Sequence, residues 1–517
     1  MTSVLIDQTI RRGLDQAPQA PAIICDQETV SYAELWERAE KLASFLRKMG
    51  VQRGDRVALF LPKGIEAVVA VYGVLLSEAI YVPLDVRSPV KRLQTILNDA
   101  VCQVILSTSS LATITTELRE GSISRPGLIH LSQGTVVEEA VADAGRDERD
   151  FRFDGDTTDT LAAILYTSGS TGVPKGVVLT QAGLLHFASW TGEFFGLTAR
   201  DRIASIASLQ FDLSTFDLFA THQAGAAVVL PGERTLLFPQ TIVPFFERHG
   251  VTVCYSVPTF WMLLEERGGL VLGRMLELRH VMFAGEVFPL PALRRLMQIL
   301  PHARFTNLFG PLETNVCSLQ MLSGIPADDA TEISIGKACP ETVLHVLGDE
   351  GTEVGPGEVG ELIVQGPSVT PGYWRNVELT EQKRWRQDPR SFRTGDLVCY
   401  GSTGELLFRG RRDHQVKLNG YRIELHEIEQ ILQRHADVAQ AVVLLCSPSV
   451  GRNRLVAVVV RRKEVVSCEA LLEFAATHLP QWSHPGRVVF RERLPTTVTG
   501  KIDRCQLQAD VEANNGT

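Results

Sequence analysis

The sequence predicts an α/β protein, with a large N-terminal domain of mostly parallel sheets and flanking helices followed by a small α+β C-terminal domain. Two observations support this prediction. The chain has 517 residues, which is more than one hydrophobic core normally serves, so at least two domains are expected. Short strand-like segments also alternate with longer segments at helical spacing, which is typical of βαβ units and parallel sheets.

The predicted elements follow one another along the N-terminal part of the chain. A helix is expected from Tyr32 to Met49, a strand from Arg56 to Leu61, and a buried helix around Ala67 to Leu76. Further strands are expected from Leu161 to Tyr166 and from His280 to Ala284. The apolar helix has about ten residues, roughly half the length that crosses a bilayer, so it is not expected to span a membrane.

Two regions indicate how the domains are organised. Ser122 to Asp154 is polar and poorly periodic, so we expect a variable surface region without catalytic residues. Between Gly401 and Gly420, glycine, arginine and aspartate gather after a strand-like segment and before a helix-like one. We therefore place the junction near Asp413, with a large domain at residues 1–411 and a small domain at residues 412–517.

The composition favours a folded cytoplasmic protein. Hydrophobic residues make up 44% and charged residues 21% of the chain, close to the average for globular domains. The formal charge of -9 comes without a basic block, so neither nucleic acid nor a membrane is expected as a partner. No signal peptide is evident at the N-terminus. The 9 cysteines lack zinc-type spacing and indicate structural thiols in a reducing compartment.

The motif with the clearest chemistry is a loop rich in glycine and hydroxyl groups, YTSGSTGVPKGV, from Tyr166 to Val177. Glycines let backbone N–H groups close around phosphate oxygens, and serine and threonine hydroxyls add donors. Lys175 offers a positive charge to a pyrophosphate leaving group. The spacing does not match a Walker A loop. The sequence therefore predicts a different kind of phosphate-binding loop.

This loop belongs to a series of motifs in a fixed order. The others are Ser31-Tyr32-Ala33-Glu34-Leu35, Ala79 to Asp85, Phe211 to Phe219, Asn307 to Thr314, Gly360 to Trp374, Arg393 to Asp396, Gly410 to Glu424 and Gly500 to Arg504. The series resembles the superfamily of acyl-CoA synthetases, luciferases and nonribosomal-peptide adenylation domains. The resemblance extends over almost the whole chain.

The resemblance implies an enzyme that uses ATP and Mg2+ to join a carboxylate to the α-phosphorus of ATP, a reaction that requires charge neutralisation and in-line placement. Phe309 would stack on adenine, Asn307 would bond its amino group, and Glu313 would hold Mg2+. Asp396 would accept the ribose hydroxyls, with Arg411 nearby. The implied ATP-binding residues are Thr167, Ser168, Gly169, Ser170, Thr171, Gly172, Gly285, Glu286, Asn307, Leu308, Phe309, Gly310, Asp396, Phe408 and Arg411.

The resemblance also assigns the catalytic lysine and a domain movement. Lys501 would bridge the substrate carboxylate and the α-phosphate, and would act with Lys175 and Glu313 as the catalytic residues. Asp413 would be the hinge of a mobile C-terminal domain, and Gly420 would line the path of a pantetheine arm. The chain departs from the family pattern in two places. Leu312 and Asn419 stand where threonine and arginine are usual, and we expect neighbouring donors to compensate for the hydroxyl lost at Leu312.

The substrate implied by the resemblance is a small apolar amino acid. A carboxylate in an apolar pocket needs a cation, so Asp212 predicts a substrate ammonium or ring nitrogen. The remaining pocket residues are Leu213, Phe216, Tyr255, Met282, Ala284, Leu308 and Val316. This set is similar to that of prolyl-activating adenylation enzymes, which predicts L-proline. Valine, pipecolate and D-alanine are the rivals, because one methylene changes binding by only about 1 to 3 kcal/mol.

The expected acceptor is the phosphopantetheine thiol of a separate carrier protein. The sequence ends at Thr517, shortly after Lys501, so we expect a free-standing enzyme without an attached carrier domain. An acyl-CoA ligase that uses free coenzyme A is an alternative, against which Asp212 and the stretch from Gly410 to Glu424 count. A catalytically silent scaffold is a third possibility, which the presence of Lys175, Glu313, Asp396 and Lys501 opposes.

Overall fold

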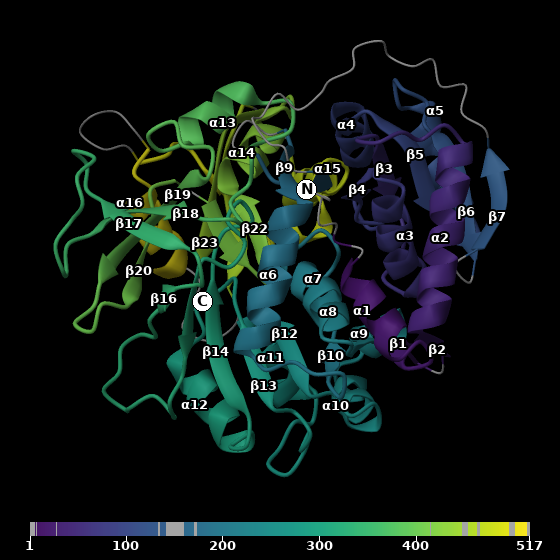
Figure 1. Cartoon of the computed structure of the whole chain (residues 1–517). Helices are drawn as coiled ribbons and strands as arrows, with labels where there is room; N and C mark the ends of the chain where they lie inside the picture. The colour runs from purple at the N-terminus through teal and green to yellow at the C-terminus, as the bar shows by residue number, and fades with distance from the viewer. Residues whose placement is uncertain are drawn as a thin grey trace. The chain divides into compact units, whose positions relative to one another are not determined.

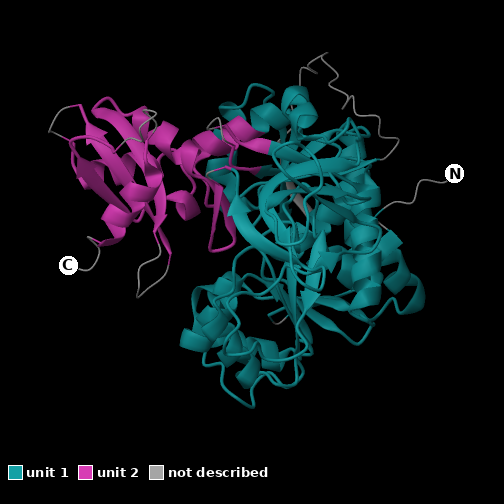
Figure 2. Cartoon of the chain, turned by 90° about the vertical axis from the view of Figure 1, so that its left-hand side faces the viewer, with its two compact units in different colours: residues 1–86, 97–166, 176–412 teal, residues 87–96, 167–175, 413–517 magenta. Residues whose placement is uncertain are grey.

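The computed structural model of the chain describes residues 6, 8–26, 28–132, 135–140, 160–169, 173–413, 415–446, 453–462, 466–495 and 502–513. The chain divides into two compact units (Figure 2). The first unit contains residues 1–86, 97–166 and 176–412, and the second contains residues 87–96, 167–175 and 413–517. The second unit thus includes two short segments from the N-terminal half, and the boundary predicted between residues 411 and 412 stays a prediction.

A nine-stranded sheet forms the centre of the first unit, in the order β16-β15-β14-β13-β12-β10-β11-β1-β2 (Figure 1). Neighbouring strands from β14 to β1 are parallel, whereas β2, β15 and β16 pair antiparallel at the edges. The strands are β1 (Pro21–Cys25), β2 (Glu28–Ser31), β10 (Arg202–Ala204), β11 (Ala227–Leu230), β12 (Val253–Ser256), β13 (His280–Phe283), β14 (Arg304–Phe309), β15 (Ser318–Met321) and β16 (Lys337–Ala338).

A second, seven-stranded sheet has the order β7-β6-β5-β3-β4-β8-β9. The strands from β6 to β8 pair in parallel, and β7 pairs antiparallel with β6 at one edge. The strands are β3 (Arg56–Leu59), β4 (Ile80–Pro83), β5 (Cys102–Ser107), β6 (Gly127–Ser132), β7 (Thr135–Ala140), β8 (Leu161–Thr167) and β9 (Lys175–Thr180). These two sheets confirm the predicted α/β class.

Helices join both sheets into one core. A single buried cluster contains side chains of both sheets and of α1 (Gln8–Gln16), α2 (Tyr32–Lys48), α3 (Ile65–Leu76) and α6 (Gln181–Phe194). Interactions between residues close in sequence explain two of these helices. Ser31 and Glu34 form a capping box at the start of α2, and the apolar composition of α3 fits its almost complete burial. Two further helices, α4 (Val90–Ala100) and α5 (Ala112–Glu120), and the short η1 (Ser109–Leu111) lie between the strands of the second sheet in sequence.

The opposite face of the central sheet has a core of its own. It is formed with α10 (Pro239–Arg248), α11 (Pro258–Arg267) and α12 (Leu290–Ile299), which Figure 1 shows beside β12 to β14. A short helix, α9 (Glu233–Leu237), precedes α10. Side chains of a strand alternate between the two faces of a sheet. The central strands therefore contribute alternate residues to the two cores.

The first unit also contains an antiparallel sheet that the sequence did not predict. It has the order β17-β18-β19-β20, with β17 (Val343–Leu347), β18 (Gly360–Gln365), β19 (Ser391–Tyr400) and β20 (Leu406–Arg411). Backbone bonds join it to the central sheet, because the Ile335 N–H donates to the Leu406 carbonyl and the Leu406 N–H to the Gly336 carbonyl. Helix α13 (Val377–Lys383) lies between β18 and β19 in sequence.

The second unit has a small core of strands and helices. The hairpin of β21 (Gln415–Leu418) and β22 (Tyr421–Glu424) leads into α14 (Leu425–Gln433). A three-stranded sheet then follows, formed by β23 (Val438–Cys446), β24 (Arg454–Arg461) and β25 (Arg487–Arg491). Its two faces carry α14 with α15 (Cys468–Ala476), and α16 (Arg504–Ala513). The turn η3 (Gln481–Ser483) completes the elements of this predicted α+β domain.

One regional prediction is wrong. The stretch from Ser122 to Asp154 was expected to be variable surface, but Gly127–Ser132 forms β6, which is buried and pairs in parallel with β5. The run of apolar residues in this strand is short, so the polar residues that follow it hid the strand in the sequence. Residues 133, 134 and 141–154 of this stretch lie outside the described residues.

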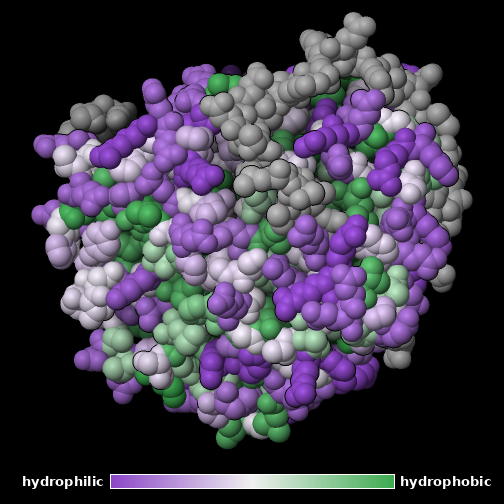
Figure 3. All heavy atoms as spheres, viewed as in Figure 1, coloured by the Kyte–Doolittle hydropathy of each residue, from purple (hydrophilic) through white to green (hydrophobic). Residues whose placement is uncertain are grey.

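The polar surface and the free cysteines agree with what the composition predicts. Figure 3 shows a face on which polar side chains predominate and apolar ones are scattered. All nine cysteines are free, and most are buried, although Cys505 is exposed. Within the described ranges, no helix combines the length and the apolar character needed to span a membrane.

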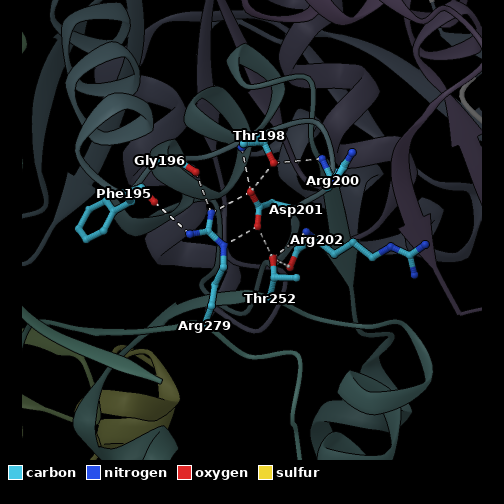
Figure 4. Close-up of polar contacts among 8 residues, drawn as sticks. All are labelled: Phe195, Gly196, Thr198, Arg200, Asp201, Arg202, Thr252 and Arg279. Carbon is cyan, nitrogen blue, oxygen red and sulfur yellow. Dashed lines mark hydrogen bonds and ion pairs between the residues drawn. The ribbon is translucent and has the colours of Figure 1, made fainter. Parts of the chain in front are cut away.

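One polar network ties the amino ends of three central strands together (Figure 4). Arg279 precedes β13 and donates from Nε and Nη2 to the two carboxylate oxygens of Asp201, at 2.8 Å each. Thr252, which precedes β12, also donates to Asp201 at 2.8 Å. Arg279 further bonds the carbonyls of Phe195 and Gly196, just after α6. Asp201, which precedes β10, is thus the centre of the network.

Asp201→Asn should lower the free energy of unfolding by about 2 kcal/mol, because the partly exposed Arg279 loses its carboxylate partner. Burial alone would raise the pKa of Asp201, but hydrogen bonds from Arg279, the Thr198 N–H and Thr252 together lower it. The contribution is therefore present above the pKa of the unfolded state and is lost as the pH falls through the lower folded pKa.

Chemical denaturation of both proteins at neutral and acidic pH measures this difference. Glu37→Gln, which breaks the exposed pair with Lys41, is the control and should cost less than about 0.5 kcal/mol. Equal effects of the two substitutions, or a difference for Asp201→Asn that grows in acid, would contradict the role given to Asp201.

Candidate active site

The residues expected to contact the substrate come together at the carboxyl ends of the central strands. Tyr255 of β12 pairs in register with Met282 of β13, and Met282 pairs with Thr306 of β14. Leu308 lies two residues after Thr306 and so points to the same face. All of the predicted apolar residues belong to or pack on one buried cluster, namely Leu213, Phe216, Tyr255, Met282, Ala284, Leu308 and Val316.

Asp212 lies beside this cluster at the start of a short helical segment. It caps α7 (Leu213–Thr215), and its Oδ1 accepts the Leu213 N–H at 3.1 Å. The π-helical turn η2 (Phe216–Ala220) follows, and Phe216 meets Tyr255 edge to face, with ring centroids 5.7 Å apart. Burial raises the pKa of Tyr255 well above its usual value, and the negative charge of Asp212 raises it further. Asp212 is therefore close enough to act on the apolar cluster.

Two aromatic rings from different sheets meet where adenine binding is predicted. Phe309 ends β14 and Phe408 lies in β20, and their ring centroids are 5.8 Å apart. Both rings pack against the main core and remain partly exposed. On the same strand as Phe309, the Asn307 Nδ2 donates to the Ser334 carbonyl at 2.9 Å. This bond orients the amide so that its Oδ1, which can only accept, is directed to a different partner such as an amino group.

The turn after β14 is tightly packed around a glycine. A Cβ on Gly310 would lie 1.7 Å from the Asn315 carbonyl oxygen, so the two backbone segments approach too closely for any side chain. Leu312, which replaces the usual threonine, is buried in the main core. After β13, Gly285 has a φ of 87°. The next residue, Glu286, accepts the backbone N–H and the hydroxyl of Thr259 and so stabilises the start of α11.

Glu313, the expected Mg2+ ligand, is a fully buried carboxylate. Its Oε1 accepts the hydroxyl of Tyr373 at 2.7 Å, and its carbonyl oxygen accepts the Thr370 N–H at 2.7 Å. The described residues contain no group of three or more histidine, cysteine or acidic side chains placed to hold a metal. Mg2+ is commonly bound by one or two carboxylates together with substrate phosphates. A single carboxylate such as Glu313 is compatible with that mode.

Asp396 and Arg411 lie opposite each other on neighbouring strands of the antiparallel sheet. They are register partners of β19 and β20, and the Arg411 Nη1 donates to the Asp396 Oδ1. Arg411 also donates to the Thr394 carbonyl at 3.1 Å. Both side chains are largely buried, with exposed fractions of 8% for Arg411 and 4% for Asp396. The ion pair leaves Asp396 a second carboxylate oxygen for a ribose hydroxyl.

The phosphate-loop residues belong to the second unit. Thr167 has a buried Oγ1 without a hydrogen-bond partner in the part of the chain that the structure describes. The Ser168 Oγ donates to the Arg422 carbonyl at 2.9 Å, and Lys175 lies 3.6 Å from the Glu424 carboxylate. At Gly169, a Cβ would lie 1.9 Å from the Val173 carbonyl oxygen. Ser170, Thr171 and Gly172 lie outside the described residues.

The residues expected to take part in the domain movement lie around the first hairpin of the second unit. Asp413 is the first residue of its C-terminal segment, and its Oδ1 accepts the Gln415 N–H at 3.3 Å. Asn419 and Gly420 connect β21 to β22 with φ values of 53° and 80°. Two positive φ values are what a type I′ hairpin turn requires, which explains an Asn-Gly pair here. Lys501 lies outside the described residues, so its role remains a prediction.

The sequence did not identify Tyr373 as part of the site. It lies in the motif that ends in Thr370-Pro371-Gly372-Tyr373-Trp374, which supported the resemblance without suggesting a role for each residue. The signal was present, because the hydroxyl of a tyrosine that follows a Pro-Gly pair needs a hydrogen-bond partner when the ring is buried. Only the fold identifies Glu313 as that partner, 60 residues away in sequence.

Comparison with known sequences identifies the family. The sequence model of the AMP-binding enzymes matches residues 10–374, and that of the AMP-binding enzyme C-terminal domain matches residues 427–501. The chain belongs to the AMP-binding enzyme family. This agrees with the resemblance found in the motifs, and the structural division near residue 412 falls between the two matched regions.

Several relatives match this AMP-binding enzyme over nearly its full length. An L-proline–(L-prolyl-carrier protein) ligase of Streptomyces coelicolor is 36% identical over 503 residues, which cover 95% of this chain and 93% of the relative. A ligase of the same description from Pseudomonas fluorescens is 32% identical, covering 98% and 99%. The Vibrio cholerae adenylation domain AlmE, solved in complex with glycyl-adenosine-5'-phosphate, has a TM-score of 0.83 at 26% identity, covering 98% of both chains.

Tyr373→Phe should raise the Mg2+ concentration needed for half-maximal activity by about tenfold, because a buried carboxylate that loses a hydrogen bond is destabilised by about 1 to 3 kcal/mol. Titration of Mg2+ in a pyrophosphate-exchange assay measures the change. Tyr32→Phe is the control, because it removes a buried hydroxyl that donates to the Ala226 carbonyl. If both variants change the Mg2+ dependence equally, Tyr373 does not act through Glu313.

Proposed function

We propose that this AMP-binding enzyme activates L-proline with ATP and transfers the prolyl group to the phosphopantetheine thiol of a separate carrier protein. In the first step a carboxylate oxygen of proline bonds to the α-phosphorus of ATP, and the bond to the pyrophosphate breaks. In the second step the carrier thiol loses its proton, its sulfur bonds to the acyl carbon, and AMP leaves.

The observation that carries the proposal is the apolar cluster at the carboxyl ends of β12 to β14 with Asp212 beside it. Among the residues proposed to line the amino-acid site, Phe216 and Met282 are fully buried, and Tyr255 carries a hydroxyl group. An apolar ring fits such a surface, and Asp212 supplies the charge that a secondary ammonium needs. The two relatives described as L-proline ligases support the same substrate.

ATP binding is supported by groups that fit a nucleotide. The rings of Phe309 and Phe408 offer a stacking surface for adenine, and Asn307 an amide oxygen for its amino group. Asp396 would accept the ribose hydroxyls. The buried hydroxyl of Thr167, which has no hydrogen-bond partner among the described residues, fits a phosphate oxygen. Mg2+, when bound, would neutralise charge on the phosphates, and Glu313 is the carboxylate that would hold it.

The chain's own residues would supply the remaining charges. Lys175 would stabilise the departing pyrophosphate, and Lys501 would hold the proline carboxylate next to the α-phosphate as negative charge accumulates there. We propose that Asp413 is the hinge that lets the C-terminal segment serve both steps, and that Gly420 lines the path of the pantetheine arm. A glycine turn suits that path, because it offers backbone without a side chain.

Exchange of labelled pyrophosphate into ATP should depend on L-proline and exceed the exchange with valine, pipecolate and D-alanine. The physical reason is the compact apolar cluster, although one methylene contributes only about 1 to 3 kcal/mol of discrimination.

Lys501→Ala should abolish exchange without unfolding the protein. Transfer to a purified holo carrier protein, measured by mass spectrometry of the carrier, tests the second step. Exchange limited to aryl or fatty acids, with coenzyme A as the acceptor, would instead identify an acyl-CoA ligase.

Asp212→Asn should raise the KM for proline by about tenfold or more and leave the KM for ATP nearly unchanged, because a charged hydrogen bond contributes about 1.5 to 3 kcal/mol. Asparagine can still cap α7, so the change removes the charge and keeps the local structure. Steady-state exchange with each substrate varied in turn measures both constants. A parallel rise in both KM values would contradict the assignment of Asp212.

A further inference from the structure

The phosphate loop, residues 167–175, and the hairpin of β21 and β22 belong to the same compact unit (Figure 2), and polar contacts join them. The Ser168 hydroxyl donates to the Arg422 carbonyl at 2.9 Å and accepts the Glu424 N–H at 3.2 Å. The Lys175 ammonium lies 3.6 Å from the Glu424 Oε1. Two groups that are expected to bind phosphate, near the two ends of the loop, therefore contact strand β22 instead.

These contacts compete with a bound pyrophosphate for the same groups. A serine hydroxyl has a single hydrogen, and that of Ser168 is donated to a backbone carbonyl. Pyrophosphate is an anion, so the Glu424 carboxylate would repel it wherever both approach Lys175. Binding of pyrophosphate to Ser168 and Lys175 therefore requires the contacts with the hairpin to break.

The local structure does not need an acid at position 424. Glu424 lies between β22 and α14, at a position where serine, threonine, aspartate or asparagine is favoured because its side chain caps the helix. The Glu424 side chain makes no capping bond. It is instead buried, with an exposed fraction of 6%, and its Oε1 accepts a hydrogen bond from the Gln415 Nε2 at 2.6 Å. A buried carboxylate is costly without a counter-charge, which the ion pair with Lys175 supplies.

We propose that Glu424 is a positioning residue that takes the place of pyrophosphate on Lys175 when the first step is complete. The inference rests on the proposed function, in which Lys175 stabilises the departing pyrophosphate. While pyrophosphate is bound, Glu424 is excluded from the loop. When pyrophosphate leaves, Glu424 pairs with Lys175 and Ser168 bonds the backbone of β22, so the hairpin docks on the loop.

This exchange of anions links the release of pyrophosphate to the second step. Asn419 and Gly420 form the turn of the same hairpin, and Gly420 is the residue proposed to line the path of the pantetheine arm. Gln415 lies opposite Glu424 in the hairpin and orients its carboxylate. A hairpin that docks only on an empty loop admits the thiol after pyrophosphate has left, when the acyl-AMP can no longer return to ATP.

Binding of methylenediphosphonate, an analogue of pyrophosphate, tests the competition without amino acid or carrier protein. Isothermal titration calorimetry of the whole chain with this probe and Mg2+ gives its Kd. Glu424→Gln should lower the Kd by about fivefold, because the hairpin no longer holds Lys175 and a larger fraction of the protein is competent to bind. Glu424→Asp should also lower the Kd, because it keeps the charge but is one methylene too short to pair with Lys175 in the same way.

Glu429→Gln is the matched control, because it also removes a buried carboxylate of this unit, which pairs with Arg504 at 2.5 Å. It should leave the Kd unchanged. A Kd that falls in neither Glu424 variant, or that falls equally in Glu429→Gln, would overturn the proposal. A fall in Glu424→Gln without one in Glu424→Asp would also overturn it, because it would indicate a general effect of charge.

The second step gives an independent readout. Glu424→Gln should transfer the prolyl group from preformed prolyl-AMP to the holo carrier protein about fivefold more slowly than the wild type, because the docked hairpin is less populated. The maximal rate of pyrophosphate exchange should be retained. An equal loss of both rates is what a purely structural role of Glu424 predicts, and it would overturn the link between pyrophosphate release and transfer.

A substitution of Lys175 separates this inference from the proposed function. Lys175→Ala should raise the Kd for methylenediphosphonate. If it binds the probe as tightly as the wild type, the proposed role of Lys175 is rejected and this inference with it. If Lys175→Ala weakens binding and the Glu424 variants do not change it, only the inference is rejected. Exchange with an acid other than L-proline would reject the proposed substrate and leave the comparison of Kd values valid.

Discussion

The alternation of side chains along β12, β13 and β14 is the constraint on which the site depends. Cys254, Val281 and Phe283 point into the core beneath α10 to α12, whereas Tyr255 and Met282 point into the opposite core. The register of these parallel strands places the second set in one row. A shift of one residue would move every one of these side chains to the other face. The network around Asp201, which joins the amino ends of β10, β12 and β13, helps to keep that register.

Several carboxylates of the large unit are buried. Three buried acids each accept a hydrogen bond from a side chain that lies 60, 15 or 12 residues away in sequence, namely Glu313 from Tyr373, Asp396 from Arg411 and Asp217 from Ser205. A buried carboxylate is costly unless it has such a partner. These buried acids therefore do more than fill the core, because an apolar residue would satisfy the core at a lower cost.

Several of the motifs from which site residues are predicted reflect local structure. Ser31 and Glu34 form a capping box, Asn419 and Gly420 a hairpin turn, and Gly310 a turn too tight for a side chain. These are short-range effects that the residues themselves impose. The antiparallel sheet β17 to β20 and the buried strand β6 were not predicted, because their identity depends on partners far away in sequence. The position of Lys501 is still a prediction.

The sequence by itself determined the α/β class, the family and the residues available for chemistry, because periodicity and motif order are local properties of the chain. Tertiary structure alone decided which of those residues meet. It paired Tyr373 with Glu313, brought Phe408 to Phe309 from a different sheet, and set the ring of Phe216 against that of Tyr255. The physical reason is that electrostatics and packing act through space. Partners separated by tens or hundreds of residues leave no periodic signal in the sequence, and only the folded sheets bring them within a few ångströms.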